Sequence, residues 1–408
     1  MPISPKIAWA LYDFANSAFA TTVMAGFFPV FFKHYWHPGD PAESTFALGM
    51  ANALSSALIM IFAPWLGAIA DQGRLHKVLL LGFTLLGIGA TFSLAPLGQG
   101  QVLYALVLYG IGLIGFSGAN IFYDSLLVEV AHPKEYERVS SLGFALGYLG
   151  GGLLFAFNVW MALRPERFGL SLQEQAIRLS FASVAGWWLV FSLPLCFGIR
   201  QTPMAKPSVN LMLRGWQQLT QTLSHLRAHR AAFLFLIAYW FYIDGVDTIV
   251  RMAVDYGLGI GLAWQDLILA LLVVQFIGFP AAVVFGRLGE KIGAKRAILC
   301  GLSTYVGVTL FAAGLSSAAE FYALAVLIGL VQGGVQALSR SLYAHLIPKD
   351  RAAEFFGFYN MLGKFAAVIG PFLVGTTGLL LQDPRAGILS VLLLFGLGAG
   401  LLLKVPAR

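Results

Sequence analysis

The sequence has little charge and almost no cysteine. Only 11% of its 408 residues are charged and two are cysteines, whereas 58% are hydrophobic. So few charges cannot cover a water-soluble fold of this size, which excludes a single soluble domain. Both cysteines lie in apolar runs, so neither a disulfide framework nor a four-ligand metal site is supported. Glycine-rich runs lack the Lys-Ser or Lys-Thr of a phosphate loop. We therefore expect no enzyme, no ATP motor, no metal and no cofactor.

Apolar runs of about 20 residues recur along the whole chain, and each is long enough as a helix to cross a hydrocarbon core of about 30 Å. They predict an all-α membrane protein with twelve transmembrane helices in two six-helix, pseudo-symmetric halves. We expect the halves to be residues 1–199 and 231–408, joined by a linker, 200–230, with one amphipathic helix. The expected spans are 7–32, 46–70, 78–97, 102–130, 139–160, 179–198, 231–256, 265–288, 296–316, 319–346, 353–380 and 385–404.

Basic residues are distributed unequally between the loops. Of the 26 lysines and arginines, 18 fall on the side of the two termini, five on the opposite side and three within spans. By the positive-inside rule, both termini and the linker are expected to be cytoplasmic in a multi-pass protein of the plasma (inner) membrane. The net charge of +7 then faces anionic lipid headgroups, and no nucleic-acid partner is needed to explain it.

The two halves repeat short motifs at matching places. Gly67-Ala68-Ile69-Ala70-Asp71-Gln72-Gly73-Arg74 follows the second span, and Gly286-Arg287-Leu288-Gly289-Glu290-Lys291-Ile292-Gly293, with Lys295 and Arg296, follows the eighth. Both contain glycine, three residues, an acid, then glycine and a base. We expect these loops to act as conformational switches, with Asp71 accepting backbone N–H groups at a helix start. Their candidate residues are Gly67, Asp71, Arg74, Gly286, Glu290 and Arg296.

These loops resemble the signature turn of the major facilitator superfamily. The opening segment Trp9-Ala10-Leu11-Tyr12-Asp13-Phe14-Ala15-Asn16-Ser17 is similar, more specifically, to that of the vacuolar amino-acid effluxer family known from autophagy and its bacterial relatives. The same similarity covers Ala119-Asn120, Tyr123-Asp124, Ser339-Arg340-Ser341, Glu354-Phe355-Phe356-Gly357 and Gly363-Lys364. One residue separates Asp71 from Gly73, one fewer than in the superfamily pattern. The resemblance implies that spans 1, 4, 7 and 10 line a central cavity.

Charged side chains at membrane depth are costly unless they are paired or hydrated, so their positions point to function. The cavity-lining spans carry Asp13, Asp124, Asp244, Asp247, Arg251 and Arg340, and span 11 carries Lys364. The three charges of span 7 are three and four residues apart, which predicts a shared helix face. On the cytoplasmic side the first half contributes acids and the second half bases. We expect Asp13 and Asp124 to pair with Arg340 and Lys364 when that side closes.

Polar residues lie within about one helical turn of these charged residues. Asn16, Asn120, Tyr123 and Gln336 accompany the charged residues and are candidates for binding a zwitterion's carboxylate and ammonium. Static ion pairs that hold helices together are the alternative role for any single residue. Protons are a candidate coupling ion, because buried carboxylates serve in proton relays.

The most favoured function is secondary transport of a small solute by alternating access, with amino-acid efflux implied by the resemblance. The alternatives are a transporter of the same fold with an unrelated cargo, such as a drug, sugar or peptide, and a non-transporting membrane sensor. The expected partners are a small-molecule substrate and the lipid bilayer, and we expect a monomer.

Overall fold

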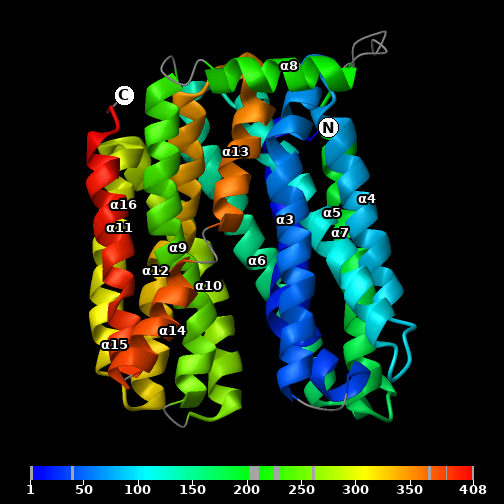
Figure 1. The fold of residues 1–408 in the computed structure, drawn as a ribbon. Coiled ribbons are helices and arrows are strands. Elements are labelled where there is room, and N and C mark those ends of the chain that lie inside the picture. Colours follow the sequence, from blue (N-terminus) through cyan, green and yellow to red (C-terminus); the bar gives the residue numbers. More distant parts are fainter. Residues whose placement is uncertain are drawn as a thin grey trace.

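The structure, a computed structural model, describes residues 3–37, 41–201, 211–224, 229–259, 262–365, 369–382 and 384–406. Within these residues, twelve helices are long and apolar enough to cross a membrane, which confirms the expected number and places of the spans. Figure 1 shows two groups of helices side by side, with both ends of the chain at the same end of the bundle. We call that end the terminal side.

The first half begins with an irregular span. Helix α1 (Pro5–Ala18) continues as a π-helix (Phe19–Phe27), a short α2 (Phe28–Phe31) and a second π-helix (Phe32–Trp36). The Thr21 hydroxyl donates a hydrogen bond to the carbonyl of Ser17, and Pro29 has no N–H to donate to the preceding turn. Both features interrupt the regular hydrogen bonding of an α-helix. The other spans of this half are α3 (Pro41–Gly73), α4 (His76–Leu94), α5 (Val102–Val130), α6 (Tyr136–Leu163) and α7 (Gln173–Gly198).

The second half has a regular beginning and a broken end. Span 11 contains α13 (Ala352–Phe365) and α14 (Ile369–Leu381), and residues 366–368 between them lie outside the described part of the chain. Span 12 consists of α15 (Pro384–Leu389) and α16 (Val391–Lys404), which are separated at Ser390. Apolar composition predicts a single run for span 12. The earlier spans are α9 (Arg230–Gly259), α10 (Trp264–Ile292), α11 (Ala294–Ala313) and α12 (Ala318–Leu346).

Two lysines in equivalent positions illustrate the internal repeat. Lys77, at the start of span 3, donates through Nζ to the carbonyls of Cys196 and Ile199 at the end of span 6, at 2.6 and 2.7 Å. Lys295, at the start of span 9, donates in the same way to the carbonyls of Leu403 and Val405 at the end of span 12, at 2.8 and 2.6 Å. Each ammonium therefore satisfies helix-end carbonyls that have no partner within their own helix.

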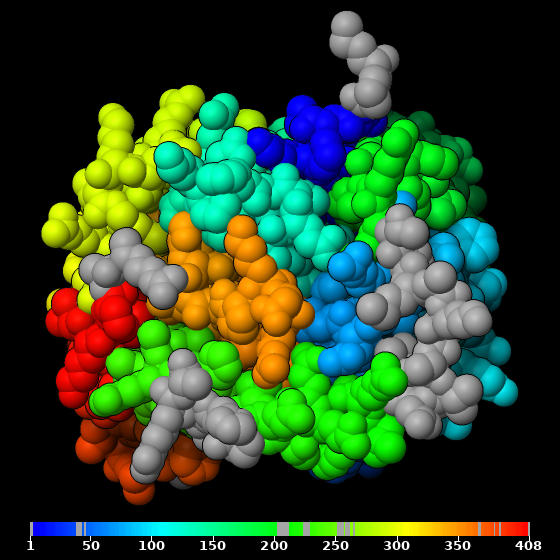
Figure 2. All heavy atoms as spheres, turned by 90° about the horizontal axis from the view of Figure 1, so that it is seen from above, coloured from blue at the N-terminus to red at the C-terminus, as the bar shows by residue number. Residues whose placement is uncertain are grey.

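The most extensive contacts between the halves are two helix pairs related by the repeat, α3 with α13 and α6 with α10, and α12 with α6 and α13 with α5 add to them. Gly67 of α3 lies against the backbone of Ala353, and Gly289 of α10 lies against Glu137 and Leu338. These contacts gather on the terminal side, where α3 ends and α13 begins. Figure 2 views this side and shows the orange segment of α13 packed against its neighbours without an opening between them. The halves are thus closed on the terminal side.

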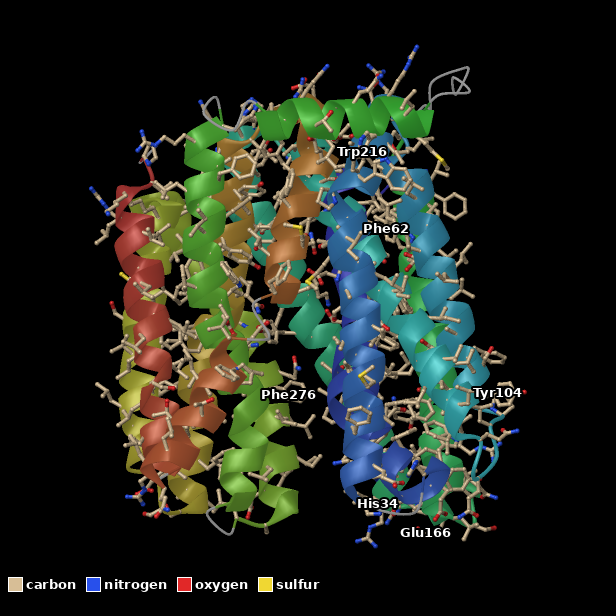
Figure 3. The ribbon with its side chains drawn as sticks, viewed as in Figure 1. His34, Phe62, Tyr104, Glu166, Trp216 and Phe276 are labelled. Atoms are coloured by element: carbon tan, nitrogen blue, oxygen red, sulfur yellow. The ribbon has the colours of Figure 1, made fainter. Side chains whose placement is uncertain are left out.

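Helix α8 (Leu211–Ser224) lies across the terminal side and contacts both halves (Figure 1). Its Gln218 accepts a hydrogen bond from Gln72 of α3 at 2.6 Å and donates one to Glu354 of α13 at 2.6 Å. Glu354 is fully buried, so this amide spans the junction between the halves. The opposite face of α8 exposes apolar side chains, including Trp216 (Figure 3).

Exposed apolar side chains also cover the length of the bundle. Figure 3 labels Phe62 of α3 and Phe276 of α10 between the two ends, and His34 and Glu166 at the end away from the termini. Phe62 and Phe276 are 42% and 43% exposed. Apolar side chains outside and polar ones at the ends are typical of a protein whose solvent is the bilayer, so the chain is a multi-pass membrane protein.

Candidate functional site

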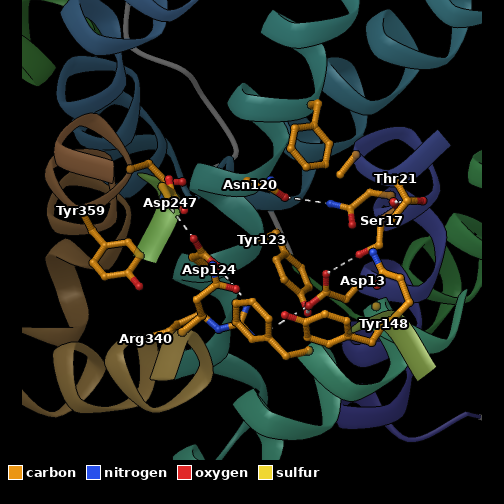
Figure 4. A pocket seen from close by; sticks show the side chains of 18 of the residues that line it. Asp13, Ser17, Thr21, Asn120, Tyr123, Asp124, Tyr148, Asp247, Arg340 and Tyr359 are labelled. Carbon is orange, nitrogen blue, oxygen red and sulfur yellow. Dashed lines mark hydrogen bonds and ion pairs between the residues drawn. The ribbon is translucent and has the colours of Figure 1, made fainter. Parts of the chain in front are cut away.

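A cavity of 410 Å³ lies between the two halves, with walls from α1, α5 and α6 of the first half and α9, α10, α12 and α13 of the second. Figure 4 shows its charged and aromatic side chains converging from these helices. Eight of the eleven residues predicted for binding or coupling line it. They are Asp13, Asn16, Asn120, Tyr123, Asp124, Asp247, Gln336 and Arg340.

Arg340 forms the polar centre of the cavity wall. Its guanidinium donates through Nη1 to Asp124 Oδ1 at 3.0 Å, and its Nη2 lies 3.9 Å from Asp13 Oδ2. It also donates through Nε to the hydroxyl and through Nη2 to the carbonyl of Ser140, both at 2.9 Å. The residue is 2% exposed. One cation of the second half is therefore bound to two acids and a backbone carbonyl of the first.

Aromatic rings enclose the same guanidinium. The Arg340 carbon Cζ lies 4.8 Å from the ring centre of Trp9 and 4.5 Å from that of Phe144, within the range of cation–π attraction. Trp9 stacks on Tyr123 and donates its indole N–H to the Tyr123 carbonyl at 2.7 Å. The Tyr123 hydroxyl in turn donates to Asp13 Oδ2 at 3.1 Å. These rings cover much of the guanidinium, and this less polar environment strengthens its attraction to the acids.

The predicted amides lie near the acids but contact different groups. Asn16 donates to Asn120 at 2.8 Å and links α1 to α5 within the first half. Besides the guanidinium of Arg340, Asp124 accepts a hydrogen bond at 3.0 Å from the side-chain amide of Asn360 of α13. Asp124 is therefore bound to two helices of the second half, α12 and α13.

The three charges of span 7 do not share one environment. Asp247 lines the central cavity, whereas Asp244 is buried and accepts the backbone N–H of Gly370, the second residue of α14, at 3.0 Å. Three residues along a helix correspond to about 300° of rotation, which suffices to direct the two carboxylates to different neighbours. The side chain of Arg251 lies outside the described residues.

Lys364 lines a different cavity from the acids with which we expected it to pair. This second cavity, of 600 Å³, lies among the first span, α3 and α5. The residue of α13 that is level with Asp124 is Asn360, and Lys364 follows it by one turn away from the terminal side. The ion pairs described for Asp13 and Asp124 are those with Arg340.

The first switch loop crosses the junction between the halves. Asp71 accepts the backbone N–H groups of Ala353 and Glu354, at 3.0 and 2.8 Å, at the start of α13. The positive end of the helix dipole favours a carboxylate there. His76 Nε2 lies 2.9 Å from the same carboxylate. Arg74, in the shortened turn, takes a left-handed conformation with φ of 51° and lines a polar cavity at this junction.

The second switch loop reproduces only part of this contact. Gly286 lies against Ser141 of α6, as Gly67 lies against α13. Glu290 and Arg296, however, are exposed. The start of α6 is bordered by the turn Pro133–Glu135, where Glu135 binds Lys6 at 2.6 Å. A repeated sequence motif has thus acquired different contacts in the two halves.

Several cavity residues were not predicted. Ser17, Thr21, Gln275 and Asn360 line the cavity, and Ser140 holds Arg340, yet an isolated polar residue in an apolar run is equally typical of helix packing. Two tyrosines of the wall, Tyr148 and Tyr359, were also missed, because membrane proteins place aromatic residues at many positions.

The charges determine what this cavity can bind. Among the described lining residues, three carboxylates (Asp13, Asp124 and Asp247) are accompanied by one guanidinium, that of Arg340. The described residues contain no group of three or more His, Cys, Asp or Glu side chains that suits a metal ion. An excess of negative charge in a small, aromatic-walled space favours a proton or an amine.

Solved structures share this architecture. FucP, a major facilitator superfamily transporter in its outward conformation, superposes with a TM-score of 0.74 at 12% identity, covering 100% of this chain and 99% of that one. The human organic anion transporter MFSD10 superposes with a TM-score of 0.70 at 17% identity, covering 97% of this chain and 98% of that one. These values show a shared fold, the major facilitator fold.

Sequence relatives narrow the family. An uncharacterized MFS-type transporter, YxiO, of Bacillus subtilis is 37% identical over 98% of this chain and 94% of its own length. Autophagy-related protein 22 of Eremothecium gossypii is 23% identical over 90% of this chain and 84% of its own. The family described as "Vacuole effluxer Atg22 like" matches residues 40–408. Because that match covers most of the chain, the protein belongs to the Atg22-like family of major facilitator transporters.

Proposed function

We propose that the protein moves a small solute across the membrane by alternating access and that amino acids are its cargo. The central cavity carries this proposal, because it lies between two halves that meet tightly on the terminal side. Its excess of carboxylates suits the amine of an amino acid. The description of the family as vacuole effluxers favours export. Stabilisation of the purified protein across a panel of amino acids, sugars and peptides tests the cargo.

The contacts described above support a proposed role for each residue. Asp13, Asp124 and Asp247 would bind the amine or a coupling proton, with Asn16, Asn120, Tyr123 and Gln336 as polar partners. Arg340 would link the halves while the terminal side is closed. The loop residues around Gly67 and Asp71 would hold the same closed arrangement. A drug, sugar or peptide as cargo is the alternative, and a solute of those classes that alone raised the melting temperature would favour it.

We predict that both termini and α8 lie in the cytoplasm and that the protein resides in the plasma (inner) membrane of the cell. Eighteen basic residues on the terminal side against five on the other motivate this orientation. Reporter fusions near Lys206 and after Arg408 should be active only in a cytoplasmic form. Periplasmic activity of either fusion would contradict the prediction.

We also predict that transport is coupled to protons through Asp13, Asp124 or Asp247. A carboxylate in an aromatic-walled cavity is a suitable proton site because it exchanges a charged for a neutral form as its surroundings change. In vesicles, an uncoupler should abolish concentrative transport, and replacing the coupling carboxylate by asparagine should leave only downhill movement. Concentrative transport that survives the uncoupler and all three substitutions would contradict this coupling. Asp266→Asn, outside the cavity, is the matched control.

A further inference from the structure

A second cavity begins where the central one ends. Ala20 of the first span lines both. On α5, Asn120 lines the central cavity, while Ser117, Leu113 and Tyr109 line the second, about one, two and three turns farther from the terminal side. Phe116 of the central cavity lies level with Ser117, so the two spaces meet at this height. The two spaces therefore follow one another along the same two helices. The shared stretch of the first span is the π-helix Phe19–Phe27, and such irregular turns occur frequently at functional sites.

The two cavities have opposite charge. Three carboxylates line the central one, and its Arg340 already binds Asp124 and Ser140. In the second cavity, Lys364 is the one charged side chain among the described lining residues. Its other walls are apolar side chains with a few polar groups, which are Asn52, Ser55, Ser56, Ser117 and Tyr109.

The ammonium of Lys364 comes from the second half, whereas the rest of the described lining comes from the first. A lysine at membrane depth is costly and is typical of sites for ions or charged substrates. Hydroxyl and amide groups beside an ammonium can complete the hydrogen bonds of a bound carboxylate. An anion there would also be attracted to both halves, so its binding would depend on how the halves are arranged.

We propose that the second cavity is an anion subsite, in which Lys364 binds the carboxylate of the transported solute. This inference rests on the proposed transport function and deepens it, because it assigns the cargo a carboxylate. The amine and the carboxylate of an α-amino acid share one carbon, so both would lie at the boundary where Ala20 lines the two cavities, with the carboxylate on the side of Lys364. A simple amine lacks the group that Lys364 would bind.

The electrostatic part of the proposal is tested without any cargo. A single cysteine replaces Ser56 after Cys196 and Cys300 are changed to serine, and two thiosulfonate reagents, one anionic (sulfonatoethyl) and one cationic (trimethylammonioethyl), are compared. In Lys364→Gln, the ratio of anionic to cationic labelling rate should fall about tenfold, as expected for loss of one nearby charge at an intermediate dielectric. Lys364→Arg should retain the ratio. For a cysteine placed at Gln336, in the central cavity, Lys364→Gln should change the ratio little. An unchanged ratio at Ser56 would overturn the subsite, even if transport is intact.

The carboxylate is tested by protection of the same cysteine. The probes are L-leucine, its deaminated acid 4-methylpentanoate, its decarboxylated amine 3-methylbutylamine and sodium chloride. Leucine and the acid should slow labelling, the amine and chloride should not, and Lys364→Gln should remove the protection. Protection by chloride as strong as that by the acid would identify an inorganic anion site and overturn the carboxylate. Protection by the acid alone, without leucine, would retain the subsite and contradict amino-acid cargo.

Discussion

Replacing Arg340 with alanine is expected to abolish transport and to open the terminal side of the protein. The substitution leaves Asp124 and Asp13 at membrane depth without the guanidinium that both now face at 3.0 and 3.9 Å. Removing one partner of a buried ion pair costs roughly 3–5 kcal/mol. We expect this loss to fall on the closed arrangement, in which α12 brings Arg340 to the first half. Each 1.4 kcal/mol changes an equilibrium constant tenfold. The ratio of closed to open protein should therefore fall on the order of 100-fold or more.

Labelling of a single cysteine measures this opening. A cysteine at Gln336 or Asn16, both in the central cavity, should react at least tenfold faster with an impermeant reagent added from the terminal side in Arg340→Ala. Arg167→Ala, an exposed arginine at the other end, is the matched control and should change neither labelling nor transport. Asp124→Arg combined with Arg340→Asp should recover more activity than either single variant. Unchanged labelling in Arg340→Ala would show that the closure depends on other contacts.

The positions of the spans could be predicted because bilayer thickness fixes the length of an apolar run, and the chain contains few charges to interrupt one. The irregular turns of span 1 and the break at Ser390 in span 12 could not, because apolar residues suit a straight and a broken helix equally. In span 1 the deviation involves hydrogen bonds made by Thr21, including one of 3.2 Å to the Gly151 carbonyl of α6. Such a contact exists only after the helices have packed.

The acids of the candidate site could be predicted because an unpaired charge in the membrane is too costly to occur without a partner. The identity of the partners depended on rotation and height along each helix. Lys364 and Asn360 are one turn apart, yet Asn360 donates to Asp124 and Lys364 lines the second cavity. Asp244 and Asp247 are also one turn apart, and they face different neighbours. Serine partners such as Ser140 carried no signal, because apolar spans contain many serines.

Replacing Gly67 with alanine is expected to prevent the terminal side from closing. A methyl group at this position would overlap the carbonyl of Ala353 and come within 2.7 Å of the Glu354 Cα, which are backbone atoms of α13. These atoms cannot move aside alone, because Asp71 binds the N–H groups of the same two residues. An extra methyl group in a packed contact typically costs about 1–3 kcal/mol. Separation of the two halves removes this clash, so the cost falls on the closed arrangement.

The expected result of Gly67→Ala is loss of transport together with labelling of the Gln336 cysteine at least tenfold faster from the terminal side. Gly82→Ala is the matched control, because a methyl group on that glycine of α4 meets no atom within 4 Å. It should leave both measurements unchanged, since alanine is also the better helix former.

Gly357→Ala, which would place its methyl group against the Ala63 carbonyl from the other side of the same junction, should reproduce the opening. Asp71→Asn keeps a carbonyl oxygen that can accept one of the two N–H groups but loses the charge at the start of α13, so its effect should be smaller. Equal labelling rates of the Gln336 cysteine in Gly67→Ala and Gly82→Ala would show that the contact between α3 and α13 does not control access to the cavity. The closure would then depend mainly on Arg340.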